Sequence, residues 1–463
     1  MLPFLNPIVC LKTLFGELKL ISYMRKKDDD LFVKRQPFLM MKSNRISTLW
    51  LSLFFSISAY SQALPMENKV YLSNIKTVLL YSSVSDFSYP IIHLNSTEHL
   101  DLSFDELIPT NENYFYTLIL CNSEWVPVAL QPNEYLQGNA YEQILNYSFS
   151  IGTYQKYVHY SASFPTENMN VKYAGNYILK VYRDYNLDNI VLTQRCFILN
   201  TKTAIRSKVR QASNIDLRYT NQEVDVEVDA SDAVIPSPFT DAKLTILQNG
   251  RFDNAVSKLT PKYINGNNFN YDYEEGNLFF GGNEFRAFDI RNIRSVGQNV
   301  SNKTIDTAIH IQLRSDEARG SQQHLSLTDY NGKFMIANST GGSANLLDYC
   351  YVTFTLNSFS SKPLEEMYVL GSFNNWQPSD ACEMKYNEAR KVYQCTMLLK
   401  QGYFNYGYFY LNNEMIFENS DTEGNHYETE NDYYIFFYQK NYTYNFDELI
   451  GYQKANSGTV ERR

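Results

Sequence analysis

Two aromatic side chains near the C-terminus form the arrangement with the most recognisable chemistry in this sequence. Trp376 ends the segment 368–376, which reads YVLGSFNNW, and Tyr406 ends the segment 402–406, which reads GYFNY. Aromatic rings bind sugars by stacking on the apolar face of a pyranose, so Trp376 and Tyr406 are candidate glycan-stacking residues. The alternative is structural, with Gly371 making a tight turn and Trp376 closing the end of a β-sandwich.

No motif for catalysis or metal binding accompanies these aromatic residues. The sequence lacks the GxSxG, Walker A, HExxH and GxGxxG patterns. None of its six histidines has a second histidine or a cysteine at ligand spacing; they are His93, His99, His159, His310, His324 and His426. The sequence therefore predicts no enzymatic activity, no catalytic residue, no cofactor and no metal site, and no small-molecule substrate is expected.

The cysteines give a weaker signal. After the N-terminal region the chain contains Cys121, Cys196, Cys350, Cys382 and Cys395, and none of them forms a CxxC pair. An odd number leaves at least one thiol unpaired. Cys382 and Cys395 could form a disulfide across a hairpin, and the alternative is that the thiols are buried and behave as small hydrophobic groups.

The composition favours an all-β protein. The 463 residues include 38 Tyr and 29 Phe, residues that suit half-buried pleated surfaces. The hydrophobic content of 44% is sufficient for real cores, which excludes general disorder. The formal charge of -9 argues against a nucleic-acid partner, because such a protein needs a basic face to displace counterions. We therefore expect tandem immunoglobulin-like β-sandwich domains.

Residues 41–61 have the features of a cleaved signal peptide. Met41, Lys42 and Arg45 give a basic start, residues 46–58 are apolar, and residues 59–61 read AYS, with small residues at the cleavage positions. The apolar core is too short for a membrane anchor, which needs about 20 apolar residues, so no transmembrane span is expected after cleavage. Because a signal peptide begins a chain, we expect residues 1–40 to be an upstream extension produced by a mis-chosen start codon.

Alternating and apolar runs divide the remaining chain into three predicted sandwiches. Residues 65–200 contain seven or eight short strands at even spacing, the pattern of an immunoglobulin-like domain. We expect a second sandwich over 205–345, a third over 346–455 and a tail over 456–463.

Individual segments sharpen this expectation. The apolar run 114–121 is predicted to be a central strand, and EVDVEV at 223–228 a strand with one exposed face. Residues 190–199 are expected to form one hairpin and residues 392–410 another. The turn before Tyr177 is similar to a tyrosine corner, in which the hydroxyl bonds back to the main chain. Glu284 and Arg286 lie two apart in an apparent strand, and a structural pair or a cross-strand partner for Arg286 is favoured over a contact with another molecule.

The C-terminal unit resembles the early-set, glycogen-binding-like immunoglobulin domains. The resemblance is carried by the segment 368–376, by Met384 and by the segment 402–406. It implies a periplasmic glycan-binding accessory protein as an alternative function, with Trp376 and Tyr406 as the stacking residues.

A longer resemblance covers roughly residues 65–455. The chain resembles the Bacteroidetes family of type IX secretion system plug proteins, formerly a domain of unknown function. The segments that carry the resemblance are YFYTLILC (114–121) with Glu124 and Trp125, EYL (134–136), 146–160, FP (164–165), GNY (175–177), GNEFRAFD (282–289), EGNHYETEN (423–431) and FDELIG (446–451).

This resemblance implies a periplasmic, non-enzymatic protein associated with the outer membrane. Its partner would be the outer-membrane translocon barrel of the type IX secretion system, whose periplasmic opening the plug blocks. Tyrosine-rich loops suit such an interface because tyrosine gives a large contact area at low entropic cost. The family has no catalytic residue to transfer to this sequence.

Overall fold

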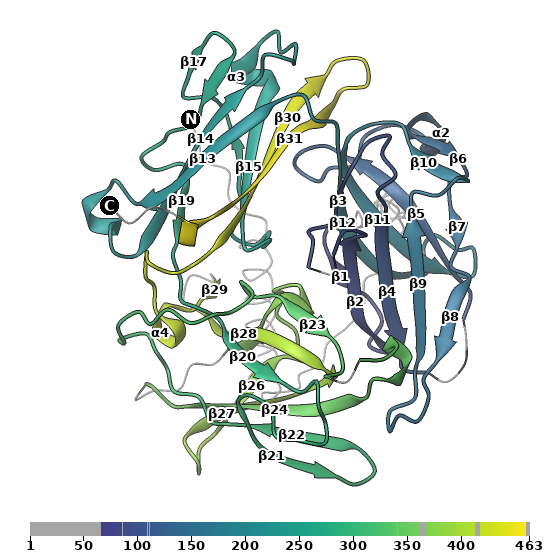
Figure 1. The fold of residues 1–463 in the computed structure, drawn as a ribbon, viewed down its shortest axis with the longest axis vertical. Helices are drawn as coiled ribbons and strands as arrows, with labels where there is room; N and C mark the ends of the chain where they lie inside the picture. Colours follow the sequence, from purple (N-terminus) through teal and green to yellow (C-terminus); the bar gives the residue numbers. More distant parts are fainter. Residues whose placement is uncertain are drawn as a thin grey trace, which may run out of the picture. The chain divides into compact units, whose positions relative to one another are not determined.

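Strands form where the sequence alternates or is continuously apolar. The computed structural model describes residues 66–85, 87–108, 110, 112–339, 341–360, 366–412 and 417–459. Residues 1–40, expected to be an upstream extension, residues 41–61, expected to be a signal peptide, and residues 460–463 of the expected tail lie outside this part of the chain. In β14 (Asn221–Asp229) the valines 224, 226 and 228 are buried, while the charged residues between 224 and 229 are half-buried. The all-β prediction, with several sandwiches, is confirmed (Figure 1).

The first sandwich comprises two main sheets over residues 69–199. One contains β1 (Lys69–Val70), β12 (Ile190–Leu199), β11 (Gly175–Arg183), β5 (Tyr114–Cys121) and β7 (Glu142–Gln143) in that order, with β3 (Ile91–His93) beside β12. The other contains β2 (Ile75–Ser82), β4 (Leu100–Glu106), β9 (Val158–Phe164) and β8 (Asn146–Phe149). A small ribbon of β6 (Leu136–Gly138) and β10 (Met169–Val171) follows α2 (Pro132–Tyr135).

Two predictions within this sandwich are confirmed and one is wrong. The strand β5 is buried on both faces, and the Tyr177 hydroxyl donates to the carbonyl of Tyr173 at 2.8 Å, as a tyrosine corner does. The predicted hairpin over 190–199 does not form. These residues make the single strand β12, which pairs along its length with β11.

The second sandwich is built from two separate parts of the chain. One sheet contains β13 (Ala204–Gln211), β14, β18 (Asn268–Asn270) and β17 (Tyr263–Asn265), with β19 (Leu278–Phe280) also on β14. The other contains β16 (Val256–Leu259), β15 (Ala242–Gln248), β30 (Asp432–Asn441) and β31 (Phe446–Asn456). Two short helical segments, η1 (Ile215–Leu217) and α3 (Pro238–Asp241), lie in its loops.

The third unit is inserted between these two parts. Its sheet runs β20 (Arg286–Asp289), β28 (Gly402–Leu411), β25 (Met367–Leu370), β26 (Glu383–Asn387), β27 (Val392–Lys400), β24 (Tyr349–Asn357), β22 (Ile309–Leu313) and β21 (Val300–Ile305), with β23 (Phe334–Ile336) and β29 (Phe417–Glu418) also on β28. The remaining short segments are η2 (Ala344–Leu346), η3 (Ser372–Asn374), α4 (Ser420–Glu423) and η4 (Ser457–Thr459).

This topology corrects the predicted boundaries 205–345 and 346–455. β20 pairs with β28 across the first boundary, and β30 pairs with β15 because its apolar side chains complete the core of the second sandwich. The predicted hairpin over 392–410 is also wrong. The strands β27 and β28 follow each other through Gln401 but do not pair, since β27 is already bonded to β24 and β26.

Buried tyrosines explain the unusual composition. Among the described residues, the largest side chains that are almost fully buried are all tyrosines. A buried tyrosine adds a large apolar area and needs a hydrogen bond for its hydroxyl. Several of these bonds reach another sandwich, as when Tyr438 of the second donates to Asn176 of the first at 3.0 Å.

Candidate functional site

The structure buries both predicted glycan-stacking residues. Trp376 is 7% exposed and packs against Phe285 and Phe409, with the Arg251 guanidinium 4.8 Å from its ring centroid. Tyr406 is completely buried, and its hydroxyl donates to Asp316 at 2.7 Å. A stacking platform has to present a ring face to solvent, and neither ring does so. The arrangement matches the structural alternative, in which Trp376 closes the core.

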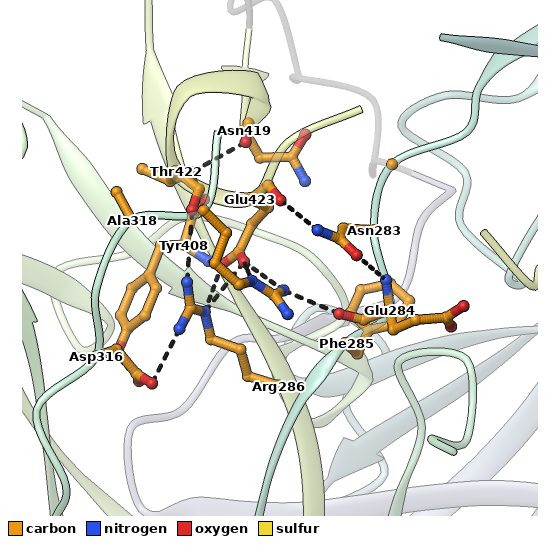
Figure 2. A network of polar contacts seen from close by, with 12 residues as sticks. Asn283, Glu284, Phe285, Arg286, Asp316, Ala318, Tyr408, Asn419, Thr422 and Glu423 are labelled. Carbon is orange, nitrogen blue, oxygen red and sulfur yellow. Dashed lines mark hydrogen bonds and ion pairs between the residues drawn. The ribbon is translucent and has the colours of Figure 1, made fainter. Parts of the chain in front are cut away.

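A buried ionic network holds Arg286, as predicted from the sequence (Figure 2). The Arg286 Nε donates to both carboxylate oxygens of Glu423 at 3.0 Å, and Nη1 donates to Asp316 at 2.9 Å. Arg319 reaches the same Glu423 at 2.6 Å, and the backbone N–H of Tyr408 donates to it at 2.8 Å. Two arginines therefore face two carboxylates, so the charges in the network balance.

The electrostatics of this network depend on the arginines. Burial on its own would raise the pKa of Glu423, but the charges of Arg286 and Arg319 outweigh burial and lower that pKa. Glu284 does not pair with Arg286; its carboxylate lies 3.2 Å from the His324 ring nitrogen. Burial raises the pKa of Glu284 to about 7. The network is structural, because its groups are already matched to one another.

Three carboxylates converge in the second sandwich without forming a free cation site. Glu223, Asp225 and Asp272 bring oxygens within 4.8 Å of one another. The guanidinium of Arg210 lies among them, at 2.6 Å from Glu223, 2.5 Å from Asp225 and 3.4 Å from Asp272. Arg210 therefore already lies where a cation would bind and neutralises part of the charge of the three acids.

A second buried ion pair joins the first sandwich to the third unit. Lys400 and Asp105 have 1% exposed side chains, and their charged atoms are 2.5 Å apart. Asp105 also accepts from Tyr349 at 2.7 Å and contacts His159 at 2.6 Å. Because both charges are removed from water, the ion pair is favourable only when the two units meet in this specific arrangement.

The cysteines are buried free thiols. Among the described residues, Cys121, Cys196, Cys350, Cys382 and Cys395 are all unpaired, so of the two alternatives the bridge between Cys382 and Cys395 does not form. The Cys395 thiol lies 3.6 Å from the carbonyl of Ala381, and burial raises its pKa to about 12. The structure thus contains the alternative considered from the sequence, in which the thiols behave as small hydrophobic groups.

An exposed apolar strip on the first sandwich is the strongest candidate for an interaction surface. We call it the aromatic edge and define it by Tyr141, Leu145, Tyr147, Phe149 and Tyr185, which are 44–74% exposed. It follows β7 and β8, which are terminal strands of the two main sheets (Figure 1). β8 carries no charged residue, and an uncharged terminal strand with exposed aromatic residues is a surface suited to a protein partner.

Sequence reasoning missed the aromatic edge. The alternation at 146–149 indicates a strand, and the structure leaves its aromatic residues Tyr147 and Phe149 44% and 46% exposed. The alternation identifies a strand with two different faces, but it does not tell which face a second sheet covers. A terminal position in the sheet is a property of topology and has no local signal in the sequence.

Together, the fold and these sites define an all-β protein of several sandwiches. Its buried polar clusters stabilise the fold, and the aromatic edge is a surface suited to a protein partner. Residues 75–200 match the family model described as the type 9 secretion system plug protein first domain. The chain therefore carries the first domain of the type IX secretion system plug family. The early-set resemblance of the C-terminal unit has no such match.

A solved structure extends the likeness beyond this domain. The crystal structure of a hypothetical protein from Parabacteroides merdae is 29% identical to this chain, with a TM-score of 0.80. The match covers 84% of this chain and 99% of that one. No curated protein matches the chain. Among the described residues, no helix is long and apolar enough to span a membrane.

Proposed function

We propose that this chain is a non-enzymatic periplasmic plug that blocks the periplasmic opening of the outer-membrane type IX secretion translocon. The observation that carries the proposal is the match of residues 75–200 to the first domain of the plug family. That domain also bears the aromatic edge, so the matched sequence and the candidate contact surface lie on one sandwich.

The physical properties of the chain support a role in steric occlusion. The three units are linked by buried contacts, which suits a body that has to block a pore without deforming. The aromatic edge is small and interrupted by polar residues, and such a surface suits an interface that has to open on demand. The glycan-binding alternative has no exposed aromatic pair at Trp376 and Tyr406 to support it.

The test is affinity purification of the tagged chain from envelopes of its source cells. We expect the large outer-membrane barrel to be recovered with the intact chain and to be depleted with a Tyr147→Asn, Phe149→Asn variant. A matched control is Tyr219→Asn with Phe280→Asn, because these residues are 72% and 68% exposed on the second sandwich. The control should recover the barrel normally.

A deletion strain provides an independent measurement. Loss of the plug should make the outer membrane more permeable to a large antibiotic, and the wild-type gene should restore the barrier. If the barrel is absent from the purified material and the permeability is unchanged, the proposal is wrong.

A further inference from the structure

A cavity of about 170 Å³ lies where all three units meet. Its walls include Gln194 and Arg195 from the first sandwich, Asn249 from the second, and Lys333 and Trp376 from the third. Since water occupies about 30 Å³ per molecule in the liquid, the space suits one small organic group and not a drug-sized ligand. The described lining residues include two cationic side chains and no acidic one.

The first cation, Lys333, forms a long ion pair with Asp432, a carboxylate that it shares with Lys454. Its side chain is 22% exposed, and its ammonium lies 3.6 Å from Asp432, beyond ordinary hydrogen-bond distance. Asp432 is already bonded to Lys454 at 2.9 Å and to the Asn456 amide at 3.0 Å. The next contact, with the Phe87 carbonyl, is 3.5 Å long. Burial accordingly lowers the pKa of Lys333 despite the charge of Asp432.

The second cation, Arg195, uses little of its hydrogen-bonding capacity. Its Nε donates to the carbonyl of Met66 at 2.8 Å, and no described carboxylate forms an ion pair with it. Its guanidinium lies 4.5 Å from the Trp125 ring and 4.3 Å from the Phe252 ring. A guanidinium has five N–H donors, so those on its two terminal nitrogens remain for another acceptor.

Neutral donors line the same cavity without partners. Gln194 is only 6% exposed, and its Nε2 has no hydrogen-bond partner among the described residues. The buried hydroxyl of Ser372 is likewise unpartnered. A buried donor without a partner destabilises the folded state, so a ligand with acceptor oxygens would relieve several such costs together.

We propose that this cavity binds a carboxylate group. Two cations and unpartnered N–H and O–H donors favour an acceptor-only, negatively charged ligand, and they disfavour a cation or a neutral sugar. The aromatic walls formed by Phe87, Tyr89 and Trp376 suit a planar group carried on an apolar stem. This inference does not depend on the proposed plug function.

Binding would couple the three units, because each of them contributes to the lining. A ligand that binds only the assembled walls stabilises the assembled state by mass action. The carboxylate could come from a small free acid or from an acidic side chain of a peptide. Both sources offer the same chemistry, and the experiment distinguishes them.

The experiment is calorimetric titration of the full chain, with the melting temperature measured in parallel at constant ionic strength. The probes are succinate, the peptide acetyl-Ala-Glu-Ala-amide, inorganic phosphate, and neutral succinamide as the control. We expect succinate or the peptide to bind and to raise the melting temperature, and succinamide to do neither. Whichever of the two binds more tightly identifies the source of the carboxylate.

Variants connect the binding to this cavity. Lys333→Met keeps the apolar stem and should weaken carboxylate binding by at least about tenfold, since a hydrogen bond to a charged group is lost. Gln194→Met is a second, uncharged test of the same wall and should also weaken binding. Lys208→Met is the control, because Lys208 is exposed on β13 and does not line the cavity.

The inference is overturned by any of three results. These are equal effects of succinate and succinamide, binding of phosphate alone, and carboxylate binding that Lys333→Met and Gln194→Met leave unchanged.

Discussion

Replacing Arg286 with methionine tests the assignment of the buried network as structural. The Arg286 side chain is 8% exposed and Glu423 is 4% exposed, so the substitution leaves a carboxylate deep in the protein without its main partner. Breaking a buried ion pair in this way costs about 3–5 kcal/mol of unfolding free energy. We expect a loss of about 3 kcal/mol, at the lower end of that range, because Arg319 still contacts Glu423.

The pH dependence of the loss identifies its cause. In the native chain the pKa of Glu423 is lowered below its usual value of 4.5. Its stabilising contribution is therefore present above pH 4.5 and is lost as the pH falls through the lowered pKa. Without Arg286, burial dominates and the carboxyl can be protonated at a higher pH. The difference between variant and native protein should thus be largest at pH 7 and should shrink toward pH 4.5.

Urea denaturation followed by tryptophan fluorescence measures this difference, because Trp376 is buried in the same unit. The matched control is Arg206→Met, since Arg206 is 70% exposed and its pair with Glu227 is 3.7 Å long. The control should change the unfolding free energy by less than about 0.5 kcal/mol. A loss below about 1 kcal/mol for Arg286→Met, or an equal loss at both pH values, would refute the reasoning.

Three further predictions follow from buried groups. Lys400→Met should lower the unfolding free energy by about 3 kcal/mol and speed limited proteolysis of the segment 344–348. The control Lys385→Met, at an exposed residue, should do neither. Equal digestion rates for the two variants would contradict this prediction. In a chain that lacks residues 1–61, all five thiols should resist Ellman's reagent in the native state and react in guanidinium without a reductant, and fewer than five reacting would indicate a disulfide. Burial raises the pKa of Glu284 to about 7, so this carboxyl stabilises the fold at low pH and the stabilisation is lost as the pH rises from 4.5 through 7. Glu284→Gln should flatten the plot of unfolding free energy against pH in this range. An unchanged plot would argue against the raised pKa of Glu284.

Local features of this fold could be predicted because they depend on local patterns. The alternation at 223–228 buries three valines on one face, and the apolar run at 114–121 becomes a strand covered on both sides. A structural partner for Arg286 was expected because Glu284 and Arg286 lie two apart in an apparent strand and so share one face. The identity of that partner could not be predicted, since Glu423 is 137 residues away in the sequence.

Features that depend on which strands meet could not be predicted. The strand β30 is as apolar as the strands of the third unit, and nothing within 432–441 shows that it returns to the second sandwich. The pair formed by Lys400 and Asp105 is similar, because a lysine at the end of a strand usually faces solvent. The cavity at the centre depends on the placement of all three units, so no single segment carries a signal for it.

The way the units are connected bears on how a blocking body could be released. Each unit contacts both of the others: Phe197 stacks on Phe436 with centroids 4.3 Å apart, Lys400 pairs with Asp105, and the Arg251 guanidinium of the second sandwich lies 4.8 Å from the Trp376 ring of the third unit.

The connections are also fixed. The backbone of Lys202, between the first two sandwiches, donates to Ile450 at 2.8 Å, and that of His426, between the third unit and β30, donates to Gly282 at 2.8 Å. A hinge requires a connection that is free to change its dihedral angles, and these connections are hydrogen-bonded to neighbouring strands. Opening one junction would also strain the other two, so the units should move together. If the chain acts as proposed, release from its partner should therefore occur by loss of the external interface, with the three units still assembled.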